Sequence, residues 1–396
     1  MRIETESGPR ISVATARAGY LPTLDGWRAI ATLAVIFFHD RHYSFGPVGT
    51  GWLFEHGNNG VDLFFAISGL LICWRLLEEE KAFGEISLRN FYIRRAFRIL
   101  PPALMFLGAV GILSLMGVFQ IGLREWLGAL FFFHNYSSLL GHLGMDSIFL
   151  DHFWSLAVEE HFYLILPATL ALTRNRFRIT ALVSMTLLTE VHRLYVLQSR
   201  TWIFVGHHTD VCLDYLMIPA LLAVIAQSRK VRERLTRWLR VWPLLLIAVV
   251  VLIIGWSGSL WQVTASAILM PMMLLGSVLN PHGYLARALE WPPLLYLGRI
   301  SYSIYLWQEL FFIGHFYRGV FPLGNLERTP LRFAATLALA MASYHFVERP
   351  LIKVGHRLAP PASPGRGDIS DGVERIVSKN TLIAKNASTW RARGDR

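Results

Sequence analysis

Ten apolar stretches, each close to the length of a membrane-crossing helix, constrain this chain more than any other feature. Windows of about 20 apolar residues give candidate spans at 24–40, 60–74, 99–118, 152–172, 178–196, 212–228, 241–256, 261–280, 292–315 and 330–352. Hydrophobic residues make up 54% of the 396 residues and charged residues only 16%, which is not the composition of a soluble protein. The sequence therefore predicts an all-α fold, a polytopic bundle of about ten transmembrane helices.

The placement of lysine and arginine predicts the orientation of this bundle. If both termini are cytoplasmic and 126–140 does not cross, 28 of the 38 basic residues fall in cytoplasmic segments, which are 1–23, 75–98, 173–178, 229–240, 281–291 and 353–396. Cytoplasmic loops of membrane proteins carry such an excess. A full span at 126–140 would move the later basic loops to the other side, so this segment is expected to be re-entrant or interfacial on the outer face. The net charge of +11 is then explained by these loops, and no nucleic-acid partner is expected.

The chain divides into three parts. Residues 1–23 form a polar cytoplasmic segment without the apolar core of a signal peptide, 24–352 form the membrane domain, and 353–396 form a basic tail that is expected to be disordered. The two cysteines, Cys73 and Cys212, cannot supply a disulfide framework or a zinc motif. The adjacent histidines at 207 and 208 also lack the spacing of a ligand set, so no metal site is expected.

Two ionisable residues share one face of the first span. Arg28 and His39 are eleven residues apart. On a helix, this spacing places the second side chain within about 20° of the direction of the first, about 16 Å further along the axis. Ionisable side chains inside spans are costly and usually mark a pathway or a reaction site. The second span runs back inward and brings Asp62 to the level of His39, where a carboxylate can fix the tautomer of a general base. The alternative is that His39 only caps the helix at the interface.

Two further groups of charged residues lie at or inside the spans. Arg94, Arg95 and Arg98 fall within about one helical turn at the inner boundary, where they either form a positive-inside signal or grip phosphates by forked hydrogen bonds. Glu159 and Glu160 lie about 10 Å in from the outer boundary, and adjacent side chains on a helix point about 100° apart. We expect one carboxylate to face a cavity and the other to be structural, unless both pair with arginines for packing.

Six motifs then follow one another between residue 24 and about residue 351, namely LDGWRAIATLAVIFFH, GVDLFFAISGLLI, RRAFRILP, FWSLAVEEHFYLILP, SYSIYLW and FVERPL. Taken together, they resemble the acyltransferase-3 family of integral membrane acyltransferases. The resemblance implies an O-acyltransferase that takes an acyl group, in the simplest case acetyl, from cytosolic acyl-CoA to a hydroxyl of a carbohydrate-type acceptor. Acyl-CoA or acetyl-CoA would be a co-substrate, and no cofactor would be permanently bound.

The resemblance also implies roles for single residues. The family's Arg-x10-His pair falls on Arg28 and His39, and its Arg-x-x-Arg motif falls on Arg95 and Arg98. The three arginines would hold the phosphates of the donor at the inner face. His39 would remove the proton of the acceptor hydroxyl as that oxygen attacks the thioester, and an acyl-histidine intermediate is the alternative.

Carboxylates of the same motifs would support the histidine. The family's Trp-Ser-Leu-x-x-Glu-Glu stretch falls on residues 154–160 and ends in Glu159 and Glu160. Either Asp62 or Glu159 would orient the imidazole of His39. In the ninth span, Tyr302, Tyr305 and Glu309 either line the same cavity or serve in packing.

The chain departs from the family pattern at a few positions. Ala29 replaces the usual glycine, Gln308 replaces a histidine that commonly follows Leu-Trp, and Cys212 and Pro219 stand where many relatives have Arg and Gly. The change at 308 indicates either that a histidine is not required there or that the acceptor pocket is altered. Many relatives also carry a C-terminal esterase-like domain. This sequence ends in a tail, so the transfer is expected to be completed within the membrane domain.

Other functions stay open at this level. The acceptor could instead be a macrolide-like secondary metabolite. A transporter or flippase of a lipid-linked sugar would also need many spans and charges inside them, although such proteins often show inverted repeats, and none is visible in the sequence. The expected location is the plasma (inner) membrane, where the chain would cross several times in contact with lipids, and the oligomeric state stays open.

Overall fold

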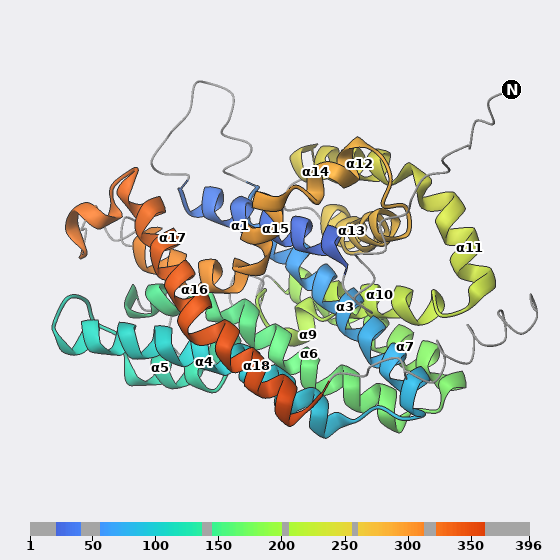
Figure 1. Ribbon diagram of the computed structural model, residues 1–396, viewed down its shortest axis with the longest axis horizontal. Helices are drawn as coiled ribbons and strands as arrows, with labels where there is room; N and C mark the ends of the chain where they lie inside the picture. Colours follow the sequence, from blue (N-terminus) through green and yellow to red (C-terminus); the bar gives the residue numbers. More distant parts are fainter. Residues whose placement is uncertain are drawn as a thin grey trace, which may run out of the picture.

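The computed structural model describes residues 21–40, 56–136, 145–199, 206–255, 260–312 and 322–360. These ranges are helical with no β-strand, which confirms the predicted all-α class (Figure 1). Most of the predicted N-terminal segment and most of the tail lie outside them. The helices are α1 (Pro22–Asp40), α3 (Asn59–Phe83), α4 (Leu88–Leu115), α5 (Leu123–Leu130), α6 (Phe153–Leu172), α7 (Asn175–Gln198), α9 (Thr209–Cys212), α10 (Asp214–Ile225), α11 (Arg229–Trp238), α12 (Trp242–Gly255), α13 (Leu260–Leu279), α14 (Tyr284–Leu289), α15 (Pro292–Arg299), α16 (Ser301–Phe312), α17 (Leu331–Ser343) and α18 (Arg349–Leu358). Short 3₁₀ turns lie at Met145–Leu150 (η4), Leu239–Val241 (η5) and Gly324–Glu327 (η7), and a π-helical turn lies at Tyr344–Glu348 (η8).

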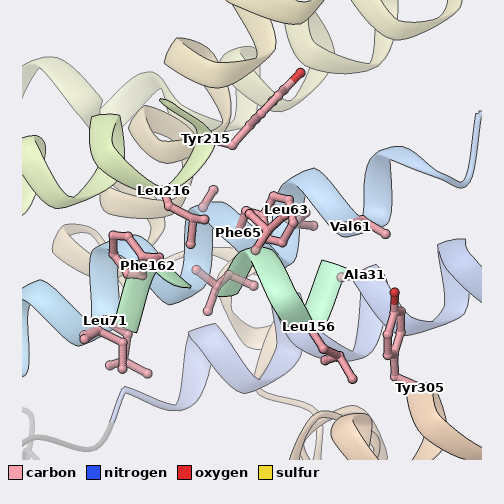
Figure 2. Close-up of a cluster of buried hydrophobic side chains, with 14 of the residues drawn as sticks. Ala31, Val61, Leu63, Phe65, Leu71, Leu156, Phe162, Tyr215, Leu216 and Tyr305 are labelled. Atoms are coloured by element: carbon pink, nitrogen blue, oxygen red, sulfur yellow. The ribbon is translucent and has the colours of Figure 1, made fainter. Parts of the chain in front are cut away.

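Helix α3 forms the centre of the bundle. It packs against α1, α6, α10 and α13, and 72% of its most apolar window is buried, compared with 33% for α4. A helix that is apolar on every side belongs inside a bundle rather than on its surface. Close approach of α10 depends on Gly69, because a Cβ there would lie 2.3 Å from the backbone oxygen of Leu216. Figure 2 shows side chains of α3, α6, α10 and α16 meeting in this core.

Four helical segments of the described ranges are long and apolar enough to cross a membrane. They are Asn59–Phe83, Leu88–Leu115, Arg229–Gly255 and Gln262–Leu279. The segments predicted at 24–40 and 152–172 are also continuous helices, with ends within two residues of the expected ones. The total of ten spans and the cytoplasmic placement of both termini stay predictions.

Several predicted spans are interrupted. The segment 292–315 is divided at Ile300 into α15 and α16, and 330–352 is divided into α17, the π-helical turn and α18. A π-helical turn adds a residue to a helical turn and frequently lies at a functional site. The described part of 126–140 includes the end of α5, whose eight residues extend only about 12 Å, too short for a crossing. Residues 137–140 lie outside the described ranges.

Candidate active site

Four cavities extend along the bundle. One of them, the arginine cavity, shares lining residues with each of the other three. The arginine cavity is defined by Arg28, Arg95 and Arg98 with Glu159 and Glu160. The histidine cavity is defined by His39, Asp62, His152 and Glu309. Two mouth cavities, defined by Arg75, Arg98 and His356, lie where α3 and α4 approach α18.

The arginine and histidine cavities meet at two residues that line both of them. These residues are Val61 of α3 and Tyr305 of α16, both labelled in Figure 2. At the opposite end, Arg98 lines the arginine cavity and both mouth cavities. Polar side chains therefore follow one path, from the end of α3 and the start of α4 to the end of α1.

The arginine cavity brings together the three arginines that the sequence pairs by motif. Arg28 is held by Asp25, with 2.9 Å between Nη1 and Oδ1. Arg95 lies over the ring of Tyr163, with Cζ 4.7 Å from the ring centroid. Within the described residues, no carboxylate lies within 4.0 Å of the Arg95 or Arg98 guanidinium nitrogens. Two guanidinium groups can thus accept an anionic ligand without first breaking an ion pair.

Both carboxylates of α6 line this same cavity, whereas the sequence indicated that only one would. Glu159 accepts hydrogen bonds from Ser68 Oγ at 2.8 Å and from Tyr163 Oη at 3.2 Å. Glu160 lines the same cavity, together with residues of α3, α4 and α16.

The imidazole of His39 is held by α16. Its Nδ1 lies 2.8 Å from Gln308 Oε1, and Gln308 Nε2 donates to Glu309 Oε2 at 2.8 Å. The NH2 group of Gln308 faces Glu309, and its amide oxygen faces the histidine. An amide oxygen cannot donate, and Nδ1 of His39 therefore carries the proton. The lone pair of the neutral ring lies on Nε2, as a general base requires.

The structure corrects the predicted partner of the imidazole. Asp62 lines the histidine cavity as expected, but its strongest charged neighbours are Asp214 and Arg193. Glu159 bonds to Ser68 and Tyr163 in the other cavity. The residue that positions His39 is Gln308, because α16 packs directly against α1.

Sequence reasoning missed a second histidine beside this group. His152 precedes α6, its side chain is 1% exposed, and its Nδ1 lies 4.0 Å from Glu309 Oε2. Its ring also packs edge-on against Phe106 and Tyr305. The only available signal was its position two residues before the Trp-Ser-Leu motif, which does not distinguish a packed histidine from a functional one.

Tyr305 places a hydroxyl at the junction of the arginine and histidine cavities. Ser155 Oγ donates to the backbone oxygen of His152 at 3.0 Å and lies 2.6 Å from Tyr305 Oη. Tyr305 Oη also lies 3.4 Å from that backbone oxygen, so either hydroxyl can be the donor between Ser155 and Tyr305. Tyr302, which the sequence grouped with it, donates instead to the backbone oxygen of Ile99 at 3.0 Å.

Other ionisable groups hold the bundle together. Arg193 pairs with Asp214, and Arg332 pairs with Asp40, with all four side chains 1% exposed or less. Cys73 and Cys212 are buried free thiols. Within the described ranges, no three His, Cys, Asp or Glu side chains are grouped as a metal site would require.

Comparison with known proteins identifies a family and several relatives. The sequence profile of the acyltransferase-3 family, described as an acyltransferase domain, matches residues 21–345. A Staphylococcus aureus (strain COL) protein provisionally named an O-acetyltransferase is 29% identical in an alignment 369 positions long that covers 85% of this chain and 58% of that protein. The O-acetyltransferase OatA of Staphylococcus aureus (strain NCTC 8325 / PS 47) is 28% identical in an alignment 372 positions long, with the same coverage of 85% and 58%.

The chain thus spans 58% of the length of these relatives. No solved structure matches it significantly. The family profile covers most of the chain and includes all the residues that define the arginine and histidine cavities. By this match, the chain belongs to the acyltransferase-3 family of membrane proteins.

Proposed function

We propose that the protein is a membrane O-acyltransferase that moves an acyl group, most simply acetyl, from acyl-CoA to a hydroxyl of a carbohydrate-type acceptor. The observation that carries this proposal is the connected pair of cavities. One contains Arg95 and Arg98, which have no carboxylate partner among the described residues, the other contains a histidine whose Nδ1 faces an amide oxygen, and Tyr305 lines both. Membership of the family and the names of the relatives support O-acyl transfer.

The donor would enter from the mouth cavities. Arg95 and Arg98, with Arg28 beside them, would bind its phosphates through forked hydrogen bonds. The pantetheine arm would then pass through the arginine cavity toward Tyr305. The rise from Arg28 to His39 along α1 is about 16 Å, comparable to the reach of an extended pantetheine arm.

The chemical step would take place where the cavities meet. His39 Nε2 removes the proton of the acceptor hydroxyl, whose oxygen attacks the thioester carbonyl. The Tyr305 hydroxyl turns from Ser155 to donate to the developing oxyanion. When the C–S bond breaks, the proton on His39 passes to the departing thiolate, so the products are an ester and free CoA. The acyl-histidine route differs only in having the ring nitrogen attack first.

The acceptor would occupy the histidine cavity. Amide side chains from three positions, Asn58, Asn59 and Gln262, line it together with Asp62. The ring of Trp154 forms another part of its wall and stacks on His207 with 4.1 Å between centroids. Amides, a carboxylate and an aromatic face suit a ligand with many hydroxyl groups. We place this cavity on the outer side of the plasma membrane and the arginines on the cytoplasmic side, as the basic loops predict.

The test uses purified protein, labelled acetyl-CoA and a soluble glycan acceptor. His39→Ala should abolish transfer, and Arg95→Ala should raise the KM for the donor about tenfold or more, since one charge-assisted contact contributes about 1.4 kcal/mol. The exposed Arg287, which lines none of the four cavities, supplies the control Arg287→Ala. Near-normal transfer by His39→Ala would refute the mechanism. Absence of acetyl-CoA turnover in the wild-type protein would favour a transport role.

A further inference from the structure

The mouth cavities contain positive charge that the motifs of the membrane domain do not explain. Arg75 of α3, Arg98 of α4 and His356 of α18 line both of them. Arg75 lies outside every family motif identified in the sequence, and His356 lies beyond residue 345, where the match to the family ends. Figure 1 shows α18 lying across α4, which brings His356 to this place.

Arg75 lies further along α3, toward the two mouth cavities, than the α3 residues that line the arginine cavity. It follows Ser68, which bonds to Glu159 in that cavity, by seven residues along α3, a rise of about 10 Å. More than a third of its surface is exposed, so its guanidinium group is accessible from the cavities. A ligand held by Arg95 and Arg98 would therefore present its outer end to Arg75.

The charges around Arg75 are mostly of the same sign. Its strongest charged neighbours are Arg95, Arg98 and Arg28. Partial burial, together with the charges of Arg94, Arg75 and Arg98, lowers the pKa of His356, so at neutral pH its imidazole is mainly neutral and donates one hydrogen bond. Arg94, which lines one of the two mouth cavities, is paired with Glu79 at 2.7 Å. The positive neighbours of Arg75 favour an anionic ligand in these cavities.

Coenzyme A carries its negative charge in two separate places. A diphosphate joins the pantetheine arm to the nucleotide, and a single phosphate is attached to the 3′ position of the ribose. If the diphosphate lies at Arg95 and Arg98, the ribose lies toward the mouth. We propose, on the basis of the proposed function, that Arg75 and His356 form the subsite for the 3′-phosphate of the donor. Arg75 binds it as a forked ion pair, and His356 donates one further hydrogen bond.

The experiment compares acetyl-CoA with acetyl-3′-dephospho-CoA as donors for the full chain in nanodiscs. For the wild-type protein, we expect the KM for the dephospho donor to be about tenfold higher, since one charge-assisted contact is lost. In Arg75→Gln, the KM for acetyl-CoA should rise most of the way to the dephospho value, and the ratio of the two should fall toward one, with only the His356 contact left. Arg75→Lys should retain an intermediate ratio, because an ammonium group keeps the charge but not the fork.

Two control variants distinguish a loss of binding at this subsite from a general loss of donor binding. Arg95→Gln should raise the KM for both donors by the same factor, because the diphosphate is common to them, and Arg287→Gln should change neither. Equal KM values for the two donors in the wild-type protein would overturn the proposal, as would an unchanged ratio in Arg75→Gln. If the wild-type protein transfers acetyl from neither donor, the proposed function itself fails, which is a different result from either of these.

Discussion

Gln308 offers the sharpest test of how the histidine is prepared for catalysis. Its side chain is fully buried and joins two groups, accepting from His39 Nδ1 and donating to Glu309, each at 2.8 Å. Replacement by leucine keeps the volume and the apolar contacts but removes both hydrogen bonds. The Nδ1 proton of His39 then loses its acceptor, and the tautomer with the proton on Nε2 is no longer disfavoured.

The expected loss follows from the cost of leaving a buried donor unpaired, which is about 1–3 kcal/mol. A central value of about 2 kcal/mol corresponds to a decrease of about 30-fold in kcat. The KM for acetyl-CoA should change little, because Gln308 does not line the arginine cavity, and Arg28 of that cavity lies about 16 Å from His39 along α1. Gln308→His should retain more activity than Gln308→Leu, since an imidazole can still accept from one neighbour and donate to the other.

The assay is initial-rate acetyl transfer at saturating acceptor, with kcat and donor KM measured separately. The midpoint of thermal unfolding serves as the control for folding of each variant. A kcat for Gln308→Leu within twofold of wild type would refute the role of Gln308 as the residue that fixes the tautomer. An equal loss in Gln308→Leu and Gln308→His would also contradict it, because the histidine retains the ability to form both hydrogen bonds.

Two further predictions concern the junction and the outer end of α1. Tyr305→Phe removes the hydroxyl at the junction of the arginine and histidine cavities. It should lower kcat about 100-fold, as loss of an oxyanion donor does, and leave the donor KM nearly unchanged. A change in KM alone would exclude this role. Arg332→Met leaves the buried carboxylate of Asp40 without its ion-pair partner, and a single loss of this kind costs about 3–5 kcal/mol. The unfolding midpoint should fall, and the double variant with Asp40→Leu should recover most of it; a double variant no more stable than the single one would contradict the pairing argument.

The sequence predicts the helices well because apolar length alone determines them. The segments at 24–40 and 152–172 become α1 and α6 with nearly the expected ends. The meeting of Arg28 with Arg95 and Arg98 could also be predicted, because all three lie near the inner ends of the first and third predicted spans. Charge and apolar length are properties of single segments, and they remain visible without any knowledge of packing.

Contacts between distant segments are what the sequence does not contain. Gln308 and His39 are 269 residues apart, and an uncharged amide in an apolar helix carries no signal of a functional partner. Asp62, by contrast, is charged and lies in the adjacent span, so sequence reasoning favoured it. The interruption at Ile300 and the π-helical turn at Tyr344–Glu348 are local adjustments to packing, and propensity does not predict them.

The polar path is built from several helices rather than from one face of α1. Arg28 and His39 share that face, but Val61 and Tyr305, from α3 and α16, line the junction between their cavities. An apolar side chain and a phenol ring at this junction would leave the pantetheine arm as the part of the donor suited to pass, while the charged nucleotide stays with the arginines. Under the proposed function, the thioester would reach His39 in a site shielded from cytoplasmic water. A base that activates an acceptor hydroxyl would activate water equally well. Because water would be scarce in this site, transfer to the acceptor would compete well with hydrolysis.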